Sequence, residues 1–373
     1  MTYFRNFIYE VKMKRVVTRK LTPGMVLAND VYTYDSYIKL LDKGMVLEDK
    51  DIARLAFYSI IDVLVEDDPV EVVEPNIPTA SGLSYSERLK ESKEFKEFRA
   101  DFEECASRFE HAINDLINND SNFNLDNMMS PIYGLLKKGR TATNIFDMLH
   151  NLRMYDDATY THCINVALIT NILGQWLKWD DEELEIATQA GLFHDIGKLM
   201  IPDTIITKPG KLTSDEYSIV QTHPQRGYEI LRPINISTHV KNAALMHHER
   251  CDGTGYPLKI KGPQIDRFAK AVAIADVYDA MTSARHYRGP MCPFIAISMF
   301  EDEGLHKYDA EIIMVFLQNI VNTYLLNTVR LNTGEIGEII FINKTHLSRP
   351  TIKVGEDYID LSKCPGVYIQ EII

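Results

Sequence analysis

Five histidines and two aspartates with the chemistry of metal ligands lie on apolar, helix-like segments between residues 162 and 276. His194 and Asp195 are adjacent in GLFHDIGK, at the end of the apolar run EELEIATQAGLF. A charged carboxylate there is costly to bury unless it is paired or bound to a metal. Imidazole and carboxylate together suit Fe, Mn or Zn. The dipeptide alone is equally compatible with the caps of two successive helices, so the other members decide: His162, His223, His247, His248 and Asp276.

Each of these residues alone is more often a satisfied polar group of a protein core than a ligand. His162 lies in the apolar segment YTHCINVALITNIL, and Asp276 is surrounded by Ala, Val and Ile in AKAVAIADVYDAM. The chain has only 11 histidines, and five of them share this apolar context. So many costly groups in one region favour a metal centre over separate burial sites.

Longer motifs extend this pattern. The segments HDIGK, KPGKLT, THPQRGYEIL, HHERCDGTGYP and AIADVYDAMTSARHYR follow one another in the order and spacing of HD-GYP domains. Over roughly residues 150–300 the chain resembles this family, a branch of the all-α, metal-dependent HD phosphohydrolases that includes cyclic di-GMP phosphodiesterases. The resemblance implies a mainly α fold with an HD-type helical core.

The resemblance also implies roles for individual residues. Asp195 would bridge two divalent ions, with iron or manganese favoured and zinc or nickel compatible. One ion would be held by His162, His194, Asp195 and Asp276, and the other by His223, His247 and His248.

Substrate contacts are implied for four further positions. Lys198 would face the phosphate as a catalytic cation beside Asp195, and Tyr256 of the Gly-Tyr-Pro signature would line the pocket. Arg285 and Arg288 match the positions of cations that hold phosphate and guanine. The alternative for both arginines is an ordinary surface ion pair in an acidic protein.

Three positions depart from the family pattern. Ala158 stands where some members carry a glutamate that holds a third metal, so two metals are expected. Cys251 replaces the usual tryptophan of HHERCDG, and IKGPQIDRFAKA is an imperfect version of the segment after the signature. None of the three removes a core ligand.

The expected reaction is hydrolysis of cyclic di-GMP to pGpG, with GMP as a further product left open, by in-line attack of a metal-bridging hydroxide. Two alternatives remain. One is a cyclic dinucleotide sensor or scaffold with weak turnover, and the other is an HD-type hydrolase of a different nucleotide. The complete ligand set argues against the first, and the signature with its two arginines argues against the second.

Four regions are expected along the chain. Residues 1–75 form a small α+β module with a short helix around residues 50–59, and residues 76–130 form a linker and a connecting helix. The apolar face of this helix is predicted by helical spacing at Leu89, Phe95, Phe98, Phe102, Ala106, Phe109 and Ile113. Residues 131–327 form the catalytic domain, in which Thr213 and Glu216 predict a capping box and Pro224 predicts that the helix is kinked or restarted there. Residues 328–373 alternate apolar and polar side chains and form a short β appendage.

Composition limits the function classes. The chain has 373 residues and a net charge of −13, which does not suit non-specific binding to DNA or RNA. Its five cysteines form no CxxC pair, and no apolar stretch is long enough for a membrane span, so a cytoplasmic protein with reduced thiols is expected. The charged connecting helix is compatible with a homodimer, and the N-terminal module with a signalling partner.

Overall fold

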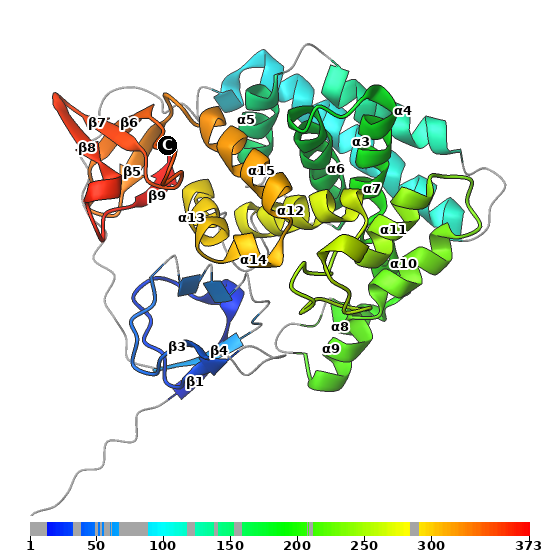
Figure 1. Cartoon of the computed structure of the whole chain (residues 1–373), viewed down its shortest axis with the longest axis horizontal. Helices are drawn as coiled ribbons and strands as arrows, with labels where there is room; N and C mark the ends of the chain where they lie inside the picture. The colour runs from blue at the N-terminus through cyan, green and yellow to red at the C-terminus, as the bar shows by residue number, and fades with distance from the viewer. Residues whose placement is uncertain are drawn as a thin grey trace, which may run out of the picture. The chain divides into compact units, whose positions relative to one another are not determined.

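The computed structural model describes residues 13–32, 39–48, 51–52, 54–55, 60, 62–66, 89–117, 124–137, 141–152, 159–206, 208, 212–283 and 291–373. The chain divides into two units, Met1–Ala80 and Ser81–Ile373. The second unit is largely helical and ends in a small sheet (Figure 1). This architecture confirms the predicted mainly α class with a small N-terminal module and a C-terminal β region.

The N-terminal unit contains two small antiparallel sheets. β1 (Met13–Val17) pairs with β4 (Asp62–Glu66), and β2 (Val31–Tyr32) pairs with β3 (Lys39–Leu41). A 3-10 turn, η1 (Thr18–Lys20), follows β1. Leu27, Leu55 and Val65 are fully buried in the apolar core of this N-terminal unit. Much of the helix predicted around residues 50–59 lies outside the described residues.

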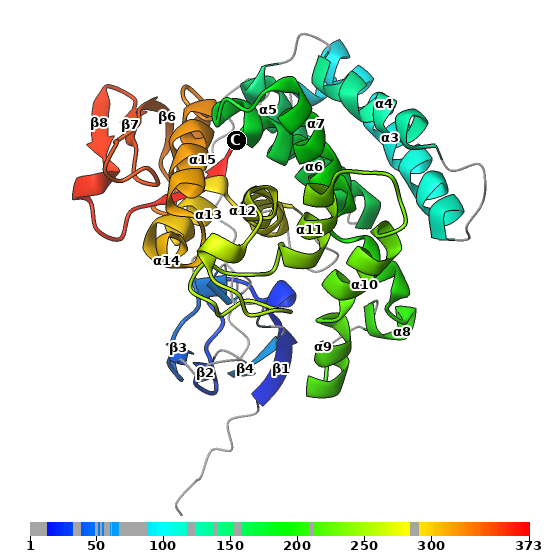
Figure 2. The same ribbon diagram turned by 45° about the vertical axis from the view of Figure 1, so that its right-hand side comes forward.

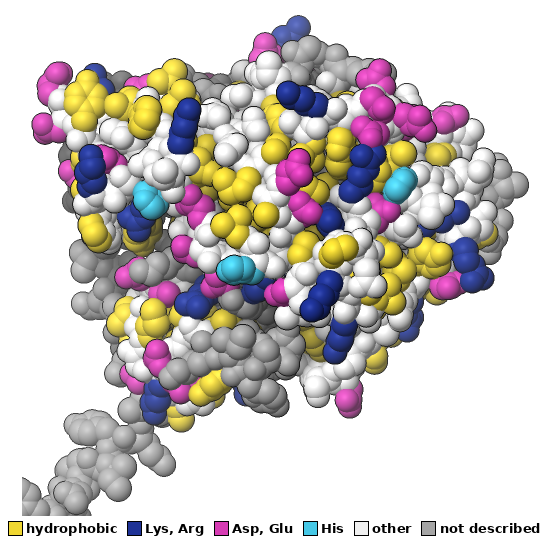
Figure 3. Space-filling model, viewed as in Figure 1, with side chains coloured by type: hydrophobic (Ala, Val, Ile, Leu, Met, Phe, Trp, Pro, Cys, Tyr) yellow, Lys and Arg dark blue, Asp and Glu magenta, His cyan; other side chains and the backbone are white. Residues whose placement is uncertain are grey.

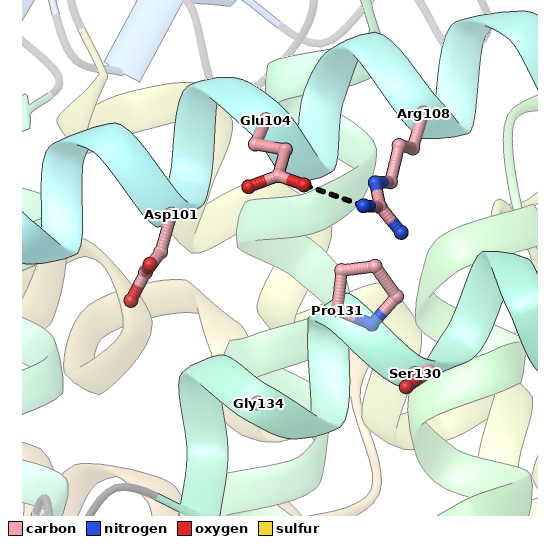
Figure 4. Close-up of a pocket in the computed structure, with 6 residues that line it drawn as sticks. All are labelled: Asp101, Glu104, Arg108, Ser130, Pro131 and Gly134. Atoms are coloured by element: carbon pink, nitrogen blue, oxygen red, sulfur yellow. Dashed lines mark ion pairs between the residues drawn. The ribbon is translucent and has the colours of Figure 1, made fainter.

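The connecting helix is α3 (Lys93–Ile117), which packs against α4 (Leu125–Lys137), as Figure 2 shows. Its buried side chains recur every three or four residues and form one apolar face. Cys105 occupies that face where the sequence pattern favoured Ala106, which is half-buried. A pocket of about 240 Å³ is lined by residues of both helices, including an exposed ion pair between Glu104 and Arg108 (Figure 4).

Three further helices form the core of the unit. They are α5 (Ala142–Leu152), α6 (Thr159–Trp176) and α7 (Asp181–Phe193). Gly191 of α7 lies so close to Ala167 of α6 that a Cβ at position 191 would meet the Ala167 backbone at 2.7 Å. This close approach brings the end of α7 against α6, and both helices carry predicted ligands there.

Short helical elements follow α7, and the predicted ligands Asp195, His223 and His247 lie at the ends of three of them. They are η2 (Ile196–Met200), α8 (Asp203–Ile206), α9 (Ser214–Val220), α10 (His223–Leu231) and α11 (Thr238–Met246). The predicted capping box is present, because Thr213 and Glu216 cap each other's backbone N–H at the start of α9. The predicted restart is also present, because α9 ends at Val220 and α10 begins with Pro224 in its first turn.

The remaining helices close the bundle around α12 (Arg267–Thr282), which contacts α6, α7 and α11. After the turn η3 (Gly262–Gln264) and α12 come α13 (Pro293–Met299), the π-helical turn η4 (Phe300–Gly304), α14 (Leu305–Lys307) and α15 (Ala310–Thr323). α12 is buried along most of its length, so its single ligand aspartate points into the protein.

The chain ends in a five-stranded antiparallel sheet with strand order β8-β7-β6-β5-β9. The strands are β5 (Thr328–Leu331), β6 (Ile336–Phe341), β7 (Thr351–Val354), β8 (Asp357–Asp360) and β9 (Ile369–Ile372), with the turn η5 (Leu361–Lys363) between the last two. Glu301 of η4 accepts hydrogen bonds from the backbone N–H groups of Leu347 (2.6 Å) and Ser348 (3.0 Å). This carboxylate therefore tethers the sheet to the helices.

One face of the molecule carries charges of both signs. On the face drawn in Figure 3, Lys and Arg side chains are scattered and form no large group, whereas several Asp and Glu side chains lie together at the upper right. A nucleic-acid backbone would require clustered cations. Among the residues that the structure describes, no helix combines the length and apolarity needed to cross a bilayer.

Candidate metal centre

Asp195 lies at the centre of a buried cluster of histidines. His194 ends α7 as its C-cap, and Asp195 begins the η2 turn directly after it. The side chains of His194 and Asp195 are 0% and 1% exposed. Burial of a carboxylate to this extent is costly unless cations or donors compensate it.

One oxygen of Asp195 faces two histidines, and a second aspartate contacts the same two rings. Nε2 of His194 lies 3.3 Å from Asp195 Oδ2, and Nε2 of His162 lies 3.7 Å from the same oxygen. Asp276 on α12 places its Oδ1 3.2 Å from His162 Nε2 and 3.9 Å from His194 Nε2. Ligand atoms of His162, His194 and Asp195 all lie within 4.8 Å of one another. Asp276, the fourth residue expected at the first ion, contacts the two histidines but is not part of this close group.

The other oxygen of Asp195 faces the second group. Nε2 of His223 lies 3.3 Å from Asp195 Oδ1, and Nε2 of His247 lies 3.6 Å from it. The ring of His248 lies with its centroid 4.9 Å from that of His223. One ligand atom from each of these four residues falls within 4.8 Å of all the others. Asp195 thus belongs to both groups through different oxygens.

Close backbone contacts at Gly197 set the distance between Asp195 and His223. A Cβ on Gly197 would overlap the carbonyl oxygen of His223, and Gly197 also approaches the backbone N of Gly227 closely. Arg226 adds a hydrogen bond at 2.5 Å to the carbonyl of Met200. These contacts hold η2 against the start of α10 and so place Asp195 beside His223.

The Nδ1 atoms of four histidines contact acceptors within the protein. In the neutral form of each ring these acceptors favour the proton on Nδ1, which leaves the lone pair of Nε2 to face the cluster. The acceptors are Asp279 Oδ2 for His162 (2.7 Å), Gly191 O for His194 (2.7 Å), Val220 O for His223 (2.8 Å) and Ala244 O for His247 (3.0 Å).

The cluster also leaves buried atoms that a cation would satisfy. Nε2 of His194 and Oδ1 of Asp195 are buried and make no hydrogen bond within the described residues. Such atoms are rare in folded proteins and call for an explanation. Imidazole nitrogens and carboxylate oxygens without thiolates form a donor set for first-row divalent metals. The residues present therefore fit a divalent metal.

The electrostatics of the aspartates agree with this fit. Burial favours the neutral form of Asp195, but Lys198 and His194 outweigh it and hold the pKa of Asp195 well below its usual range. Burial acts in the same way on Asp276, and the hydrogen bond with His162 outweighs it and holds the pKa of Asp276 well below its usual range. Both carboxylates are therefore negatively charged at neutral pH.

The histidines differ between the two groups. Burial lowers the pKa of His247 to about 4, and burial also lowers the pKa of His248 well below its usual value. Both rings are neutral at pH 7 and free to act as ligands. Burial opposes a proton on His162 as well, but hydrogen bonds with Asp276 and Asp279 raise its pKa to about 9. A bound cation would have to replace that proton.

Two predicted substrate contacts lie beside the cluster. Nζ of Lys198 is 2.5 Å from Asp195 Oδ2, and the Lys198 side chain is 30% exposed. The ring of Tyr256 stacks on that of His248, with centroids 4.6 Å apart and planes at 26°. Burial raises the pKa of the Tyr256 hydroxyl well above its usual value, so the group is a neutral hydrogen-bond donor.

Some predicted positions cannot be placed. Arg285, Arg288 and Ala158 lie outside the described residues, so their expected roles remain predictions. Cys251 is half-buried, and its Sγ would lie 3.3 Å from a Cβ on Gly262, which shows that the segment after the signature packs on it.

Sequence reasoning missed two acidic residues of this region. Asp279 accepts from His162, and its position three residues after Asp276 on the same helix face could have identified it. Glu249 directly follows His248 and is only 2% exposed. Its partners are backbone N–H groups of a later loop, which no sequence pattern identifies.

Comparison with known proteins relates this geometry to a family. Residues 143–312 match the HD domain family. The cyclic di-GMP phosphodiesterase PA4108 of Pseudomonas aeruginosa is 36% identical over 207 residues, which cover 55% of this chain and 50% of that protein. The cyclic di-GMP phosphodiesterase response regulator RpfG of Xanthomonas campestris is 40% identical over 138 residues, or 36% of each chain.

A relative with another substrate in its name also matches. The 3'3'-cGAMP-specific phosphodiesterase 1 of Vibrio cholerae is 35% identical over 170 residues, which cover 45% of this chain and 39% of that protein. The chain spans about half the length, or less, of these curated relatives.

Proposed function

We propose that this protein is a metal-dependent phosphodiesterase of the HD-GYP family that acts on cyclic dinucleotides, with cyclic di-GMP as the first candidate substrate. The match of residues 143–312 to the HD domain family supports this proposal. Hydrolysis of one phosphodiester would open the ring and give pGpG. A second hydrolysis would give GMP. The names of the similar proteins support the substrate class.

One observation carries this proposal: Asp195 offers each of its two oxygens to a different group of imidazole nitrogens. A carboxylate placed in this way can be shared by two ions. His162, His194 and Asp276 would complete one site, and the group around His223 would complete the other. Iron and manganese are the favoured metals, and the donor set also accepts zinc or nickel. Two bound ions would supply Lewis acidity toward the phosphate oxygens and lower the pKa of a water between them.

The side chains around the cluster would act on the substrate. Lys198 carries a partly exposed ammonium beside Asp195, where it can stabilise the negative charge that develops on a phosphate during hydrolysis. Tyr256 can donate a hydrogen bond or contact a base from its position over His248. Arg285 and Arg288 would hold phosphate and guanine, as the family resemblance implies.

The test is hydrolysis of cyclic di-GMP and 3'3'-cGAMP by anaerobically purified protein loaded with Mn²⁺ or Fe²⁺. The double variant His194→Ala/Asp195→Ala is the control, because it removes one ligand of the first group and the shared carboxylate. We expect turnover by the parent protein and a loss of at least about 10³-fold in the double variant, as is typical when a metal centre is removed.

The outcomes separate the candidates. Preferential turnover of cyclic di-GMP supports the substrate named first, and preferential turnover of 3'3'-cGAMP reassigns the substrate within the same reaction. A protein with both metals bound that cleaves neither compound contradicts the proposal. Tight binding without cleavage in that case would point to a sensor.

A further inference from the structure

We propose that Glu249 is the positioning residue of the loop 255–260, which contains the Gly-Tyr-Pro signature. Its carboxylate holds the backbone of this loop, and the loop in turn holds Tyr256 against His248. The inference rests on the proposed function, because it assigns a role to Glu249 at the same metal centre.

The carboxylate of Glu249 accepts three consecutive backbone hydrogen bonds. Its Oε1 accepts from the N–H groups of Leu258 (2.5 Å) and Lys259 (3.1 Å), and its Oε2 accepts from that of Ile260 (3.1 Å). The side chain is 2% exposed, whereas Leu258 and Lys259 are exposed. The loop therefore has exposed side chains and a backbone fixed from inside by one charged group.

The backbone on either side of Glu249, at the end of α11, is also held by hydrogen bonds. The backbone N–H of Glu249 donates to Met246 O (2.8 Å), so the residue continues the turn that ends α11. The Arg250 guanidinium donates to the carbonyl oxygens of His247 (3.1 Å) and Glu249 (2.9 Å) and lies over the Tyr308 ring at 5.0 Å. The Glu249 carboxylate and its three hydrogen bonds to the backbone of residues 258–260, here called the clamp, thus start from the backbone that carries His247 and His248.

The loop closes onto that same backbone at its other end. A Cβ on Gly255 would overlap the backbone of His248, Glu249 and Arg250, so the approach requires glycine. The Tyr256 N–H donates to the carbonyl oxygen of His248 (3.2 Å), and the Tyr256 ring stacks on the His248 imidazole. The loop is thereby held between this contact and the Glu249 carboxylate.

A carboxylate is the group that this arrangement requires. Three N–H groups need acceptors only, and both oxygens of a carboxylate accept. A glutamine of nearly the same volume would replace one oxygen with an NH₂ group, which would face N–H donors. It would also lose the charge that strengthens each hydrogen bond. Glu249→Gln therefore disrupts the clamp with little change in side-chain volume.

The clamp makes a prediction for the unmodified protein. The amides of residues 258–260 belong to no regular element of secondary structure and would exchange freely with solvent without an acceptor. Hydrogen exchange, resolved to single amides, should show these three protected by at least about 100-fold relative to an unstructured chain. If these three amides of the unmodified protein exchanged as fast as those of an unstructured chain, the proposal would be overturned.

The substitution Glu249→Gln has a matched control in Glu301→Gln. Glu301 also accepts hydrogen bonds from two backbone N–H groups, but those belong to Leu347 and Ser348, in the turn between β6 and β7. We expect Glu249→Gln to speed exchange of the amides 258–260 by about 10-fold or more, since charge-assisted hydrogen bonds are lost. Glu301→Gln should leave these amides unchanged and speed exchange at residues 347 and 348 instead.

Metal binding separates positioning from simple loop stability. Apo protein is titrated with Mn²⁺, and the visible spectrum of bound Co²⁺ reports the ligand geometry. Glu249→Gln should weaken Mn²⁺ binding at the site of His223, His247 and His248 by about 10-fold and alter the Co²⁺ spectrum. Loss of the contacts that orient a metal ligand typically has this effect. Glu301→Gln should match the parent in both.

Two results overturn the inference. Either the loop amides of Glu249→Gln exchange as slowly as those of the parent, or the loop loosens while Mn²⁺ affinity and the Co²⁺ spectrum stay unchanged. Neither measurement uses a nucleotide. A parent protein that cleaves no cyclic dinucleotide would therefore contradict the proposed function and leave the test of Glu249 intact.

Discussion

At the scale of single residues, the orientation of an imidazole depends on the partner of its second nitrogen. His162 differs from His194, His223 and His247, because its Nδ1 contacts a carboxylate, Asp279, rather than a backbone carbonyl. Asp279 is 1% exposed, and Ser283 Oγ donates to its second oxygen at 3.0 Å. A carboxylate held in this way fixes the ring and makes Nε2 a stronger ligand.

The substitution Asp279→Asn should therefore weaken Mn²⁺ binding by about 10- to 100-fold, the usual effect of losing such a partner. An amide is a weaker acceptor, and its NH₂ group can also turn toward Nδ1 and shift the proton to Nε2. The measurement is Mn²⁺ titration of the apo protein.

Asp266→Asn is the matched control for this substitution. Asp266 also contacts a histidine, His239, at 2.7 Å, and it lies at the opposite end of the same helix. Asparagine keeps the N-cap, so both folding and Mn²⁺ affinity should be preserved. Equal losses in the two variants would mean that Asp279 acts only through the stability of α12.

The ligand histidines and aspartates could be proposed from sequence because each lies in a motif of several residues, such as HDIGK. Their partners are harder to find. The spacing of Asp279 from Asp276 marks Asp279 as a candidate, but its pairing with His162, 117 residues away, depends on the packing of α12 on α6. The carbonyl partners at Gly191 and Val220 come from the helical turns that precede His194 and His223 and leave no trace in residue type.

At the scale of elements, the centre depends on how closely η2 approaches α10. Gly197→Ala should destabilise the helical unit by about 1–3 kcal/mol or more, because the added Cβ overlaps the His223 carbonyl and forces the two segments apart. It should also weaken Mn²⁺ binding, because His223 would move away from Asp195. Urea unfolding of the apo protein and Mn²⁺ titration measure the two effects.

Gly134→Ala is the control for added bulk. Gly134 lies inside α4, where a new Cβ would meet nothing within 4 Å. Alanine there should raise the free energy of unfolding by up to about 1 kcal/mol through helix propensity and leave Mn²⁺ affinity unchanged. If Gly197→Ala were as well tolerated, the close approach of η2 and α10 would not be needed for the centre.

Elements were predictable to the extent that their signals are local. The capping box at Thr213 and Glu216 and the restart at Pro224 depend on neighbouring residues, and both were predicted. The apolar face of α3 was predicted from its phenylalanines, but Cys105 rather than Ala106 completes it. Helical spacing permits both positions, and the contact with α4 and α6 decides between them.

At the scale of the whole molecule, the cluster around Asp195 joins segments that are distant in the sequence. Its proposed ligands come from α6, the end of α7, α10, the end of α11 and α12, which together span most of the helical core. Ions that bind only the folded state stabilise it in proportion to the logarithm of their concentration. The unfolded chain cannot assemble the two groups around Asp195, so metal binding as proposed would be linked to folding of this unit.

Removal of the metals should therefore lower the unfolding temperature of the helical unit. A free ion at 100 times its dissociation constant contributes about 2.7 kcal/mol, which corresponds to roughly 5–10 °C for a unit of this size. Calorimetry with Mn²⁺ and with a chelator measures the shift, and His194→Ala/Asp195→Ala should lose most of it. An equal Mn²⁺ shift in the double variant would locate the bound ions elsewhere. No shift in the parent would mean that the cluster around Asp195 is a buried network of ion pairs and hydrogen bonds rather than a metal centre.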